Sequence, residues 1–387
     1  MRVAVLFELT SPESGGSYSF NKLIFDSLVK NEFKYTHEFL TIYKSRKSVG
    51  IGPDIALPGK IKYRLDFLKS LLAQIRVREF LKSGISWEIC KSASLNSILR
   101  KNNIDVVWAV QPLGVRLEIP YLTTSWDIAH KITPYFPEVS SAGAQNEKRD
   151  KVCKSTFSGA FRIVVGTNRG KQEIIDAYGV NAERLLVNPF PVDMLSLSSS
   201  VSRSPNQIIY PANFWPHKNH LILIKALKLL SNRSDLKFKL VLTGTDKGSL
   251  GAVKSLVTSL GLQDFVEFSG FISKLELDDL YSRSNLLVFP SLIGPDNLPP
   301  LEALAKGCKI AVSDIPGARE QFGNFATYFD PYNVQDLANA IQHNLEDDSY
   351  ALNFLELGDF LQARSVERYV EIVVKEIEKL DYIIDTL

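Results

Sequence analysis

The segment 285–307, NLLVFPSLIGPDNLPPLEALAKG, combines residue types that suit an anion and a pair of hydroxyl groups. A short apolar run leads into a loop, and a helix is expected next because proline stands near its start and glycine just past its end. The free N–H groups of the first turn favour an anion such as a diphosphate. We expect Glu302 in that turn, where its carboxylate could accept hydrogen bonds from two neighbouring hydroxyls, such as those of a ribose. The alternative is that Glu302 only complements the helix dipole.

A second candidate is Lys218 in the segment 210–227, YPANFWPHKNHLILIKAL. Here a strand is expected to end, a loop follows, and a helix begins near Asn219. An ammonium group at the carboxyl end of a strand and beside a helix start suits a phosphate. A solvated loop lysine is the alternative. His217 and His220 flank the lysine, but neither a cysteine nor a third ligand is near in sequence, so we expect no metal there.

Two segments of the first half are weaker candidates. Gly15 and Gly16 allow a backbone turn, and the helix expected after them offers further N–H groups to an anion. The pattern is neither G-x-G-x-x-G nor a Walker motif, so it does not favour a dinucleotide or ATP. Asp127 and His130 are expected in a loop facing a cleft, where they could position a sugar hydroxyl or assist proton transfer. Local capping by Asp127 and a hydrogen-bonded structural histidine form the alternative.

The elements that must position these residues follow an α/β pattern, because short apolar runs alternate with helical stretches along the chain. We predict two tandem Rossmann-like doubly wound domains that face a central cleft: residues 1–193, and residues 207–365 after a serine-rich linker at 194–206. The helix expected at 366–387 would pack back on the first domain. Open α/β sheets bind ligands outside the carboxyl ends of their strands. The expected strands are 3–9, 36–43, 104–110, 120–126, 161–167, 207–212, 238–244, 266–270, 285–290 and 309–314.

The composition is that of an ordinary globular chain. Of 387 residues, 45% are hydrophobic and 23% charged, which excludes a disordered or collagenous protein, and the formal charge of +2 gives no field for nucleic acid. Three cysteines far apart form neither a metal-ligand spacing nor a disulfide framework, which favours a reducing compartment. Neither a signal-type start nor an eighteen-residue apolar run is present, so we expect a cytoplasmic location.

Together these segments resemble a GT-B glycosyltransferase of the large retaining group called family 4, the glycosyl transferases group 1. The resemblance covers nearly the whole chain. Two further segments, WDIAHKITPYFPE (126–138) and YPANFWPHKNH (210–220), resemble a bacterial branch that builds surface polysaccharides such as lipopolysaccharide. The most specific stretches are 268–292 (FSGFISKLELDDLYSRSNLLVFPSL) and 298–307 (LPPLEALAKG), supported by 163–193 and 315–341.

The resemblance implies transfer of a sugar, with retained configuration, from a nucleoside diphosphate sugar to a glycan or a lipid-linked oligosaccharide. Lys218 would bind the diphosphate and Glu302 the ribose hydroxyls. We expect neither a cofactor nor a metal, because Lys218 and a helix start supply positive charge. The catalytic residues that it suggests are His130, Asp127 and Lys218. The donor-binding residues are Gly15, Gly16, Lys218, Gly244, Phe271, Ile272, Asp296, Asn297, Leu298 and Glu302.

Two positions depart from the family pattern. The family carries a glutamate eight residues before Glu302, where this chain has Gly294, and Asp296 is close enough in sequence to substitute. The family also often carries an arginine six residues before Lys218, where this chain has Ala212. The loss of one cation from a diphosphate site would cost about 1–3 kcal/mol.

Arg319 or Lys247 could supply the missing cation. The departures keep one alternative open, a catalytically inactive GT-B protein that binds a nucleotide sugar or a glycan. An NAD-type oxidoreductase is suggested only by the doubly wound strands, and its glycine fingerprint is absent from the sequence.

The stretch 60–82 carries seven basic residues and only Asp66 and Glu79 as acids. A basic amphipathic helix can lie on anionic lipid, where a lipid-linked acceptor would be found. Peripheral contact with the inner face of the cytoplasmic membrane is therefore one interpretation. A solvated basic face over an ordinary core stripe is the other.

Overall fold

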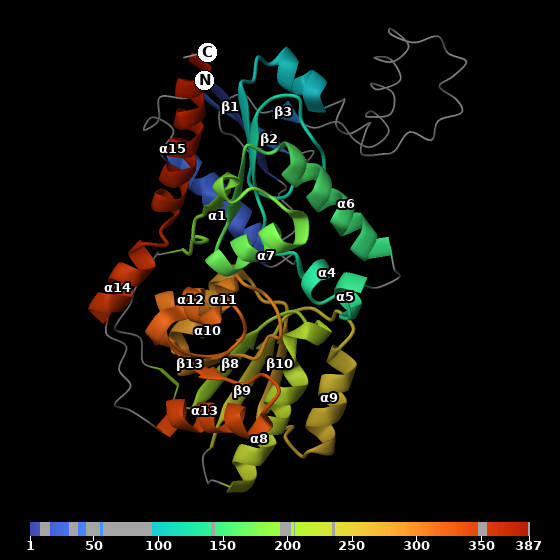
Figure 1. The fold of residues 1–387 in the computed structure, drawn as a ribbon. Helices are drawn as coiled ribbons and strands as arrows, with labels where there is room; N and C mark the ends of the chain where they lie inside the picture. Colours follow the sequence, from blue (N-terminus) through green and yellow to red (C-terminus); the bar gives the residue numbers. More distant parts are fainter. Residues whose placement is uncertain are drawn as a thin grey trace.

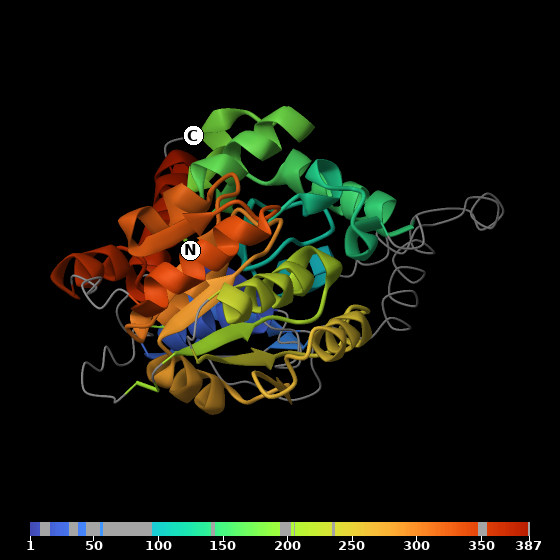
Figure 2. The same ribbon diagram turned by 90° about the horizontal axis from the view of Figure 1, so that it is seen from below.

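The protein folds into two parallel sheets, one in each half of the chain, with helices packed around each sheet (Figure 1). Figure 2 shows the same arrangement from below. Both sheets are doubly wound, because the strand order reverses in the middle of each one. The prediction of an α/β fold with two such units is confirmed. The computed structural model describes residues 1–7, 16–30, 38–43, 55–56, 95–140, 144–193, 203–204, 206–233, 237–346 and 354–385.

The first sheet has seven strands in the order β3-β2-β1-β4-β5-β6-β7, all paired in parallel. Strand β4 is buried along its whole length, which is why the sequence shows it as a continuous apolar run. The strands are β1 (Arg2–Phe7), β2 (Glu38–Tyr43), β3 (Ile55–Ala56), β4 (Val106–Ala109), β5 (Tyr121–Thr124), β6 (Arg162–Val165) and β7 (Leu185–Val187). The helices are α1 (Gly16–Lys30), α4 (Ala129–Ile132), α5 (Pro137–Ser140), α6 (Ala144–Gly159) and α7 (Asn168–Tyr178).

The second sheet has six strands in the order β10-β9-β8-β11-β12-β13, again all parallel. Its strands are β8 (Gln207–Pro211), β9 (Lys239–Thr243), β10 (Val266–Gly270), β11 (Leu286–Phe289), β12 (Lys309–Ser313) and β13 (Ala326–Phe329). Its helices are α8 (His220–Arg233), α9 (Leu250–Ser259), α10 (Lys274–Arg283), α11 (Leu298–Ala305), α12 (Ala318–Phe322), α13 (Val334–Glu346) and α14 (Phe354–Gln362).

The last helix, α15 (Val366–Asp385), returns to the first domain and lies beside α1 (Figure 1). Tyr369 and Val373 on α15 share a core with Phe20 and Ile24 on α1. The side-chain amide of Asn188, just after β7, donates to the carbonyl of Tyr369 at 3.1 Å. The described part of α15 thus packs on the first domain.

All ten predicted strands coincide with observed strands to within a few residues. Strands β3, β7 and β13 were not predicted. Strands β3 and β7 have only two and three residues, and β13 has one fully buried position, so none gives a sustained apolar run. The basic stretch 60–82 lies outside the described residues, as does most of the proposed linker 194–206. In the described part of the chain, no helix is both long enough and apolar enough to cross a membrane.

Candidate active site

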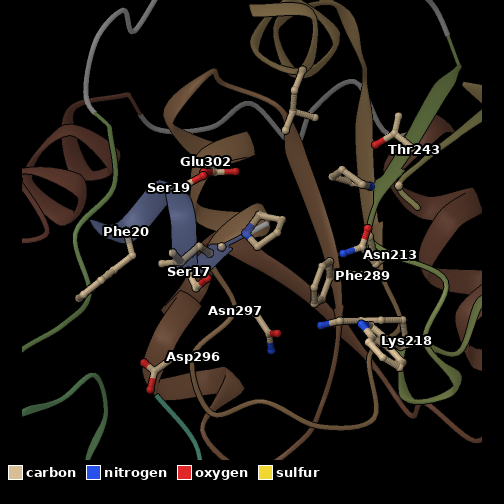
Figure 3. A pocket seen from close by; sticks show the side chains of 18 of the residues that line it. Ser17, Ser19, Phe20, Asn213, Lys218, Thr243, Phe289, Asp296, Asn297 and Glu302 are labelled. Atoms are coloured by element: carbon tan, nitrogen blue, oxygen red, sulfur yellow. The ribbon is translucent and has the colours of Figure 1, made fainter. Parts of the chain in front are cut away.

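A cavity of about 420 Å³ lies between the two domains (Figure 3). It is found at the carboxyl ends of β8, β9 and β11, where the order of the second sheet reverses, which is the place where an open α/β sheet binds its ligand. The first domain lines it with Gly16, Ser17, Ser19, Phe20, Trp126 and Phe190. The second domain lines it with Pro211, Ala212, Asn213, Trp215, His217, Lys218, Thr243, Gly244, Phe271, Ile272, Leu277, Tyr281, Phe289, Asp296, Asn297, Leu298, Pro299 and Glu302.

Gly244 lets two loops of the second sheet approach closely at the cavity. Its φ is +135°, and a Cβ atom there would lie 2.3 Å from the carbonyl oxygen of Ala212. No side chain fits that space, so glycine at this position brings the loop after β9 against the loop after β8. Asn213 joins the same loops, since its Oδ1 accepts from the backbone N and from Oγ1 of Thr245, both at 2.9 Å.

Lys218 brings a poorly compensated positive charge to the cavity. Its Nζ lies 4.9 Å from the centroid of the Phe289 ring and 3.4 Å from Oγ of Ser291. Among the described residues no carboxylate forms an ion pair with it. Burial lowers the pKa of Lys218 from 10.5 to about 8, although the charges of Asp127 and Glu138 act in the opposite direction. An anion in the cavity would therefore relieve an unfavourable charge.

The backbone of Lys218 is also fixed. It closes the short 3₁₀ turn Pro216–Lys218, and its carbonyl accepts a hydrogen bond of 2.7 Å from the hydroxyl of the buried Tyr210. The ammonium thus projects from a held position at the end of β8. Lys218 is the single lysine or arginine among the described residues that line the cavity.

Helix α11 starts at the cavity, but it offers fewer N–H donors than the sequence suggested. Pro299 and Pro300 occupy its second and third positions and carry no N–H. The N–H of Asn297 is already bonded to Oε1 of Gln321 at 2.9 Å. Of the first turn, Leu298 is therefore the residue at the cavity wall whose N–H is available for an anion.

Glu302 does not stand in the first turn of α11, as the sequence suggested. The helix begins at Leu298, so Glu302 is its fifth residue, and the first turn holds no acidic side chain. One carboxylate oxygen accepts from the hydroxyl of Tyr281 at 3.0 Å, and the other lies 3.9 Å from Nζ of Lys274. Both partners come from α10. They hold the carboxylate at the wall of the cavity and leave it able to accept further hydrogen bonds. This favours binding of a ligand by Glu302 over mere compensation of the helix dipole.

Asp296 lines the cavity, but its carboxyl group lies against the first domain. A Cβ atom on Gly166 would lie 2.1 Å from Oδ1 of Asp296, so only glycine at 166 admits this carboxyl group. Oδ2 is buried and has no hydrogen-bond partner in the described part of the chain. Burial, with the charges of Glu320 and Glu173, raises the pKa of Asp296 well above its usual range.

Gly294, which stands where the family carries glutamate, has a φ of +116°. A Cβ atom there would meet Oδ1 of Asn297 at 2.8 Å, and Nδ2 of Asn297 donates to the Gly294 carbonyl at 2.8 Å. The loop is thus built around a glycine. In Figure 3, Asp296 lies apart from Lys218, with Asn297 between them. Whether Asp296 takes over a sugar contact stays a prediction.

The structure does not bring Asp127 or His130 to the cavity wall. Oδ1 of Asp127 accepts from the backbone N of Ala129 at 2.8 Å, which is a local cap. His130 is buried, and its Nε2 is hydrogen-bonded to the hydroxyl of Tyr178 at 2.8 Å. Burial lowers the pKa of this histidine. These contacts match the structural alternative for both residues, although the charge of Asp127 still acts on Lys218.

The other expected residues divide between the cavity and elsewhere. Gly16 lines the cavity as the first residue of α1, while Gly15 lies outside the described residues. Phe271 and Ile272 follow β10 and line the cavity on the second domain. Asn297 and Leu298 both line the cavity at the start of α11, but the backbone N and carbonyl of Asn297 are already bonded to the side chain of Gln321.

Neither residue proposed to replace the missing cation lines the cavity. Arg319 forms an ion pair with Asp314 at 2.7 Å and lies over the ring of Tyr328. Lys247 is exposed, and its Nζ lies 5.9 Å from the centroid of the Trp215 ring at the cavity edge. The described residues thus leave the place of Ala212 without a substitute cation at the cavity wall.

Several lining residues were not predicted from the sequence. Ser17 and Ser19 are on the first turns of α1, and Asn213 and Thr243 are at the ends of β8 and β9. Polar side chains directly after buried strands are the signal that would have indicated the last two. Within the described ranges, no three histidine, cysteine, aspartate or glutamate side chains gather where they could hold a metal ion.

The comparisons agree with this geometry. Residues 198–357 match the family model described as Glycosyl transferases group 1. The O-antigen chain mannosyltransferase RfbU of Salmonella typhimurium is 27% identical over 226 residues, which cover 58% of this chain and 62% of RfbU. Mannosylfructose-phosphate synthase of Agrobacterium fabrum is 30% identical over 299 residues, which cover 70% of this chain and 65% of that protein. The matched regions thus span less than two thirds of both relatives.

A solved structure extends the similarity to nearly the whole chain. The Anabaena protein HepE, determined in complex with UDP, superposes with a TM-score of 0.69 over 98% of this chain and 100% of its own, at 17% identity. At that identity the likeness concerns the fold, in which two Rossmann-like domains face each other across a cleft.

Proposed function

We propose that this chain, whose residues 198–357 belong to the glycosyl transferases group 1 family, is a retaining glycosyltransferase of cell-surface polysaccharide synthesis. It would take a sugar from a nucleoside diphosphate sugar and pass it to a glycan or a lipid-linked oligosaccharide. The observation that carries the proposal is the cavity between the domains, at the carboxyl ends of parallel strands, which is lined by a poorly compensated ammonium and a tethered carboxylate.

Each end of the cavity has chemistry that suits one part of such a donor. Lys218 and the N–H of Leu298 would hold the diphosphate, and Glu302 would accept hydrogen bonds from the ribose hydroxyls. Phe271 and Ile272, on the loop after β10, would lie against the base. The sugar would then point towards the first domain and the acceptor.

The protein would accelerate transfer mainly by positioning and by charge. Breaking the bond between the sugar and the diphosphate leaves negative charge on the leaving phosphate. The ammonium of Lys218 is already partly desolvated, so it would stabilise that charge with little reorganisation of solvent. No step in this scheme requires a metal or a resident cofactor.

The relatives suggest where to look for the substrate. RfbU and mannosylfructose-phosphate synthase carry mannose in their names, and HepE was solved with UDP. We therefore propose mannose as the first donor sugar to test, on both GDP and UDP, and a lipid-linked glycan at the cytoplasmic face of a membrane as the acceptor.

The test is a transfer assay with GDP- and UDP-linked sugars and lipid-linked oligosaccharide acceptors. Released nucleoside diphosphate would be quantified, and the configuration of the new linkage read by NMR. We expect product with the donor's anomeric configuration. An inverted linkage would contradict the retaining mechanism.

Gly294 and Ala212 favour one second candidate, an inactive protein that binds the nucleotide sugar without transferring it. Tight nucleotide binding with no turnover on any donor and acceptor pair would support that alternative. Absence of any nucleotide binding would contradict both.

A further inference from the structure

One contact between the domains places a carboxylate of the first domain on the loop that carries Lys218. Glu138, on α5, accepts a hydrogen bond from the backbone N of His217 at 3.0 Å and a second one from the imidazole Nδ1 of the same residue. The side chain of Glu138 is 6% exposed and that of His217 is 13% exposed, so the pair is almost sealed from water. His217 directly precedes Lys218, and the contact therefore holds the backbone next to the ammonium.

The surroundings show a built interface rather than a chance contact. Phe136 and Val139 of the first domain pack against Leu292 and Ile293 of the second. The carbonyl of His217 also accepts from the backbone N of Leu292 at 2.8 Å. The turn with Lys218 and the loop after β11 are thus held together against α4 and α5.

The charge states fit this arrangement. Burial lowers the pKa of His217, although Glu138 opposes the effect, so the imidazole is neutral near pH 7 and Nδ1 carries the donated proton. Burial acts to raise the pKa of Glu138, but the hydrogen bonds from His217 outweigh it and lower the pKa. The carboxylate is therefore ionised, and its charge helps to keep Lys218 protonated.

We infer that Glu138 is a positioning residue for glycosyl transfer, which acts through His217 to place the Lys218 ammonium on the donor diphosphate. The contact joins the two segments 126–138 and 210–220, which lie far apart in sequence. Since Glu138 belongs to the first domain, the donor site is complete only while the domains are together. The inference rests on the proposed function.

The experiment measures the Kd of GDP and UDP by calorimetry for Glu138→Ala, His217→Ala and the double variant, with the donor KM and kcat beside it. We expect each single variant to weaken binding roughly ten- to a hundred-fold, the range for hydrogen bonds to a charged group. The double variant should bind no more weakly than Glu138→Ala, because Glu138→Ala already removes the imidazole bond that His217→Ala removes, together with the backbone bond. The donor KM should rise, while the acceptor KM stays unchanged.

Conservative variants distinguish a loss of positioning from a general loss of stability. Glu138→Gln keeps an accepting oxygen and His217→Asn keeps a donating nitrogen, so both should recover most of the lost affinity. Glu118→Ala is the matched control, because Glu118 forms an exposed ion pair with Arg100 on the first domain at 3.0 Å and does not line the cavity. It should bind as the wild type does.

Wild-type affinity in Glu138→Ala, or losses that multiply in the double variant, would overturn the inference while the proposed function stands. If Glu138→Ala does not fold, the His217 variants decide: loss with alanine and recovery with asparagine supports the inference, and equal loss in both overturns it. A wild-type protein that binds no nucleoside diphosphate overturns the inference and the proposed function together.

Discussion

Replacing Lys218 with methionine should stabilise the free protein and abolish its response to nucleotide. The structure holds this ammonium half-buried beside Phe289, and burial lowers its pKa from 10.5 to about 8. That difference corresponds to about 3 kcal/mol of unfavourable free energy in the folded state. We reduce this to about 2 kcal/mol because the side chain keeps some contact with solvent.

The sign follows from the lowered pKa. Below pH 8 the lysine is charged in both states, so the folded state carries the full cost, and the Lys218→Met variant should be more stable. Between pH 8 and pH 10.5 the folded protein loses the proton first, the wild type gains stability relative to the variant, and the difference disappears. At pH 7 a gain of about 2 kcal/mol would raise Tm by roughly 4–8 °C for a domain of this size.

The assay is thermal unfolding at pH 7 with UDP, GDP, dTDP and ADP. A nucleotide present at about one hundred times its Kd stabilises the wild type by about 2.7 kcal/mol. The variant should start from a higher Tm and show no such shift. Lys254→Met is the control, because Nζ of Lys254 also lies over a phenylalanine ring, at 5.4 Å, but this lysine is exposed and away from the cavity. A destabilised variant, or one that keeps the nucleotide response, would refute the reasoning.

Three further changes test other parts of the site and its supports. Glu302→Gln should reduce the preference for ribonucleotides over 2′,3′-dideoxy analogues about ten-fold, because a carboxylate that accepts from the hydroxyls is lost. Calorimetry with both nucleotide types measures the ratio of affinities, and an unchanged ratio would exclude the ribose role of Glu302. Gly244→Ala should lower the free energy of unfolding by at least about 2 kcal/mol, because the φ of +135° and the nearby Ala212 carbonyl leave no room for a Cβ atom. Gly251→Ala is the control: it has open space around it on α9, so it should raise the free energy of unfolding by about 0.5–1 kcal/mol. Burial lowers the pKa of His220 from 6.5 to about 3, so the wild type should lose about 3 kcal/mol of stability between pH 6.5 and pH 4 through this residue. His220→Phe should lack this loss. If the stability of the wild type and of the variant fell in parallel with pH, the result would contradict the prediction.

The strands were predictable where both faces are buried, because burial on both faces gives a continuous apolar run in the sequence. Strands such as β8 and β11 are buried on both faces, so they appear as continuous apolar runs, and the polar residues after them mark the edge where ligands bind. This pattern indicated Lys218, which follows β8, whereas Glu302 was expected in the first turn of α11 and is its fifth residue. The pattern failed for β13, because three of its four residues are only half-buried and leave no continuous apolar run.

The contacts of the site that cross from one domain to the other were not predictable from the sequence. The contact of Glu138 with His217 depends on how the two domains pack, and no local pattern encodes it. The same holds for Asp296, which is near the expected position in sequence but whose carboxyl group lies against Gly166 of the first domain. Asp127 and His130 follow a strand end as ligand residues do, yet their polar atoms are bonded to Ala129 and Tyr178.

The return of α15 to the first domain has a mechanical consequence. The chain passes between the domains twice, after β7 and again before α15, and the two passages are joined where the backbone N of Val192 donates to the carbonyl of Arg364 at 3.1 Å. If the chain connected the two domains only once, they could rotate relative to each other about any axis. Because a hydrogen bond joins the two connections, we expect any relative motion of the domains to pivot near Val192 and Arg364 and twisting to be restrained. If the domains separate, closure should thus bring Glu138 back to the same position against His217.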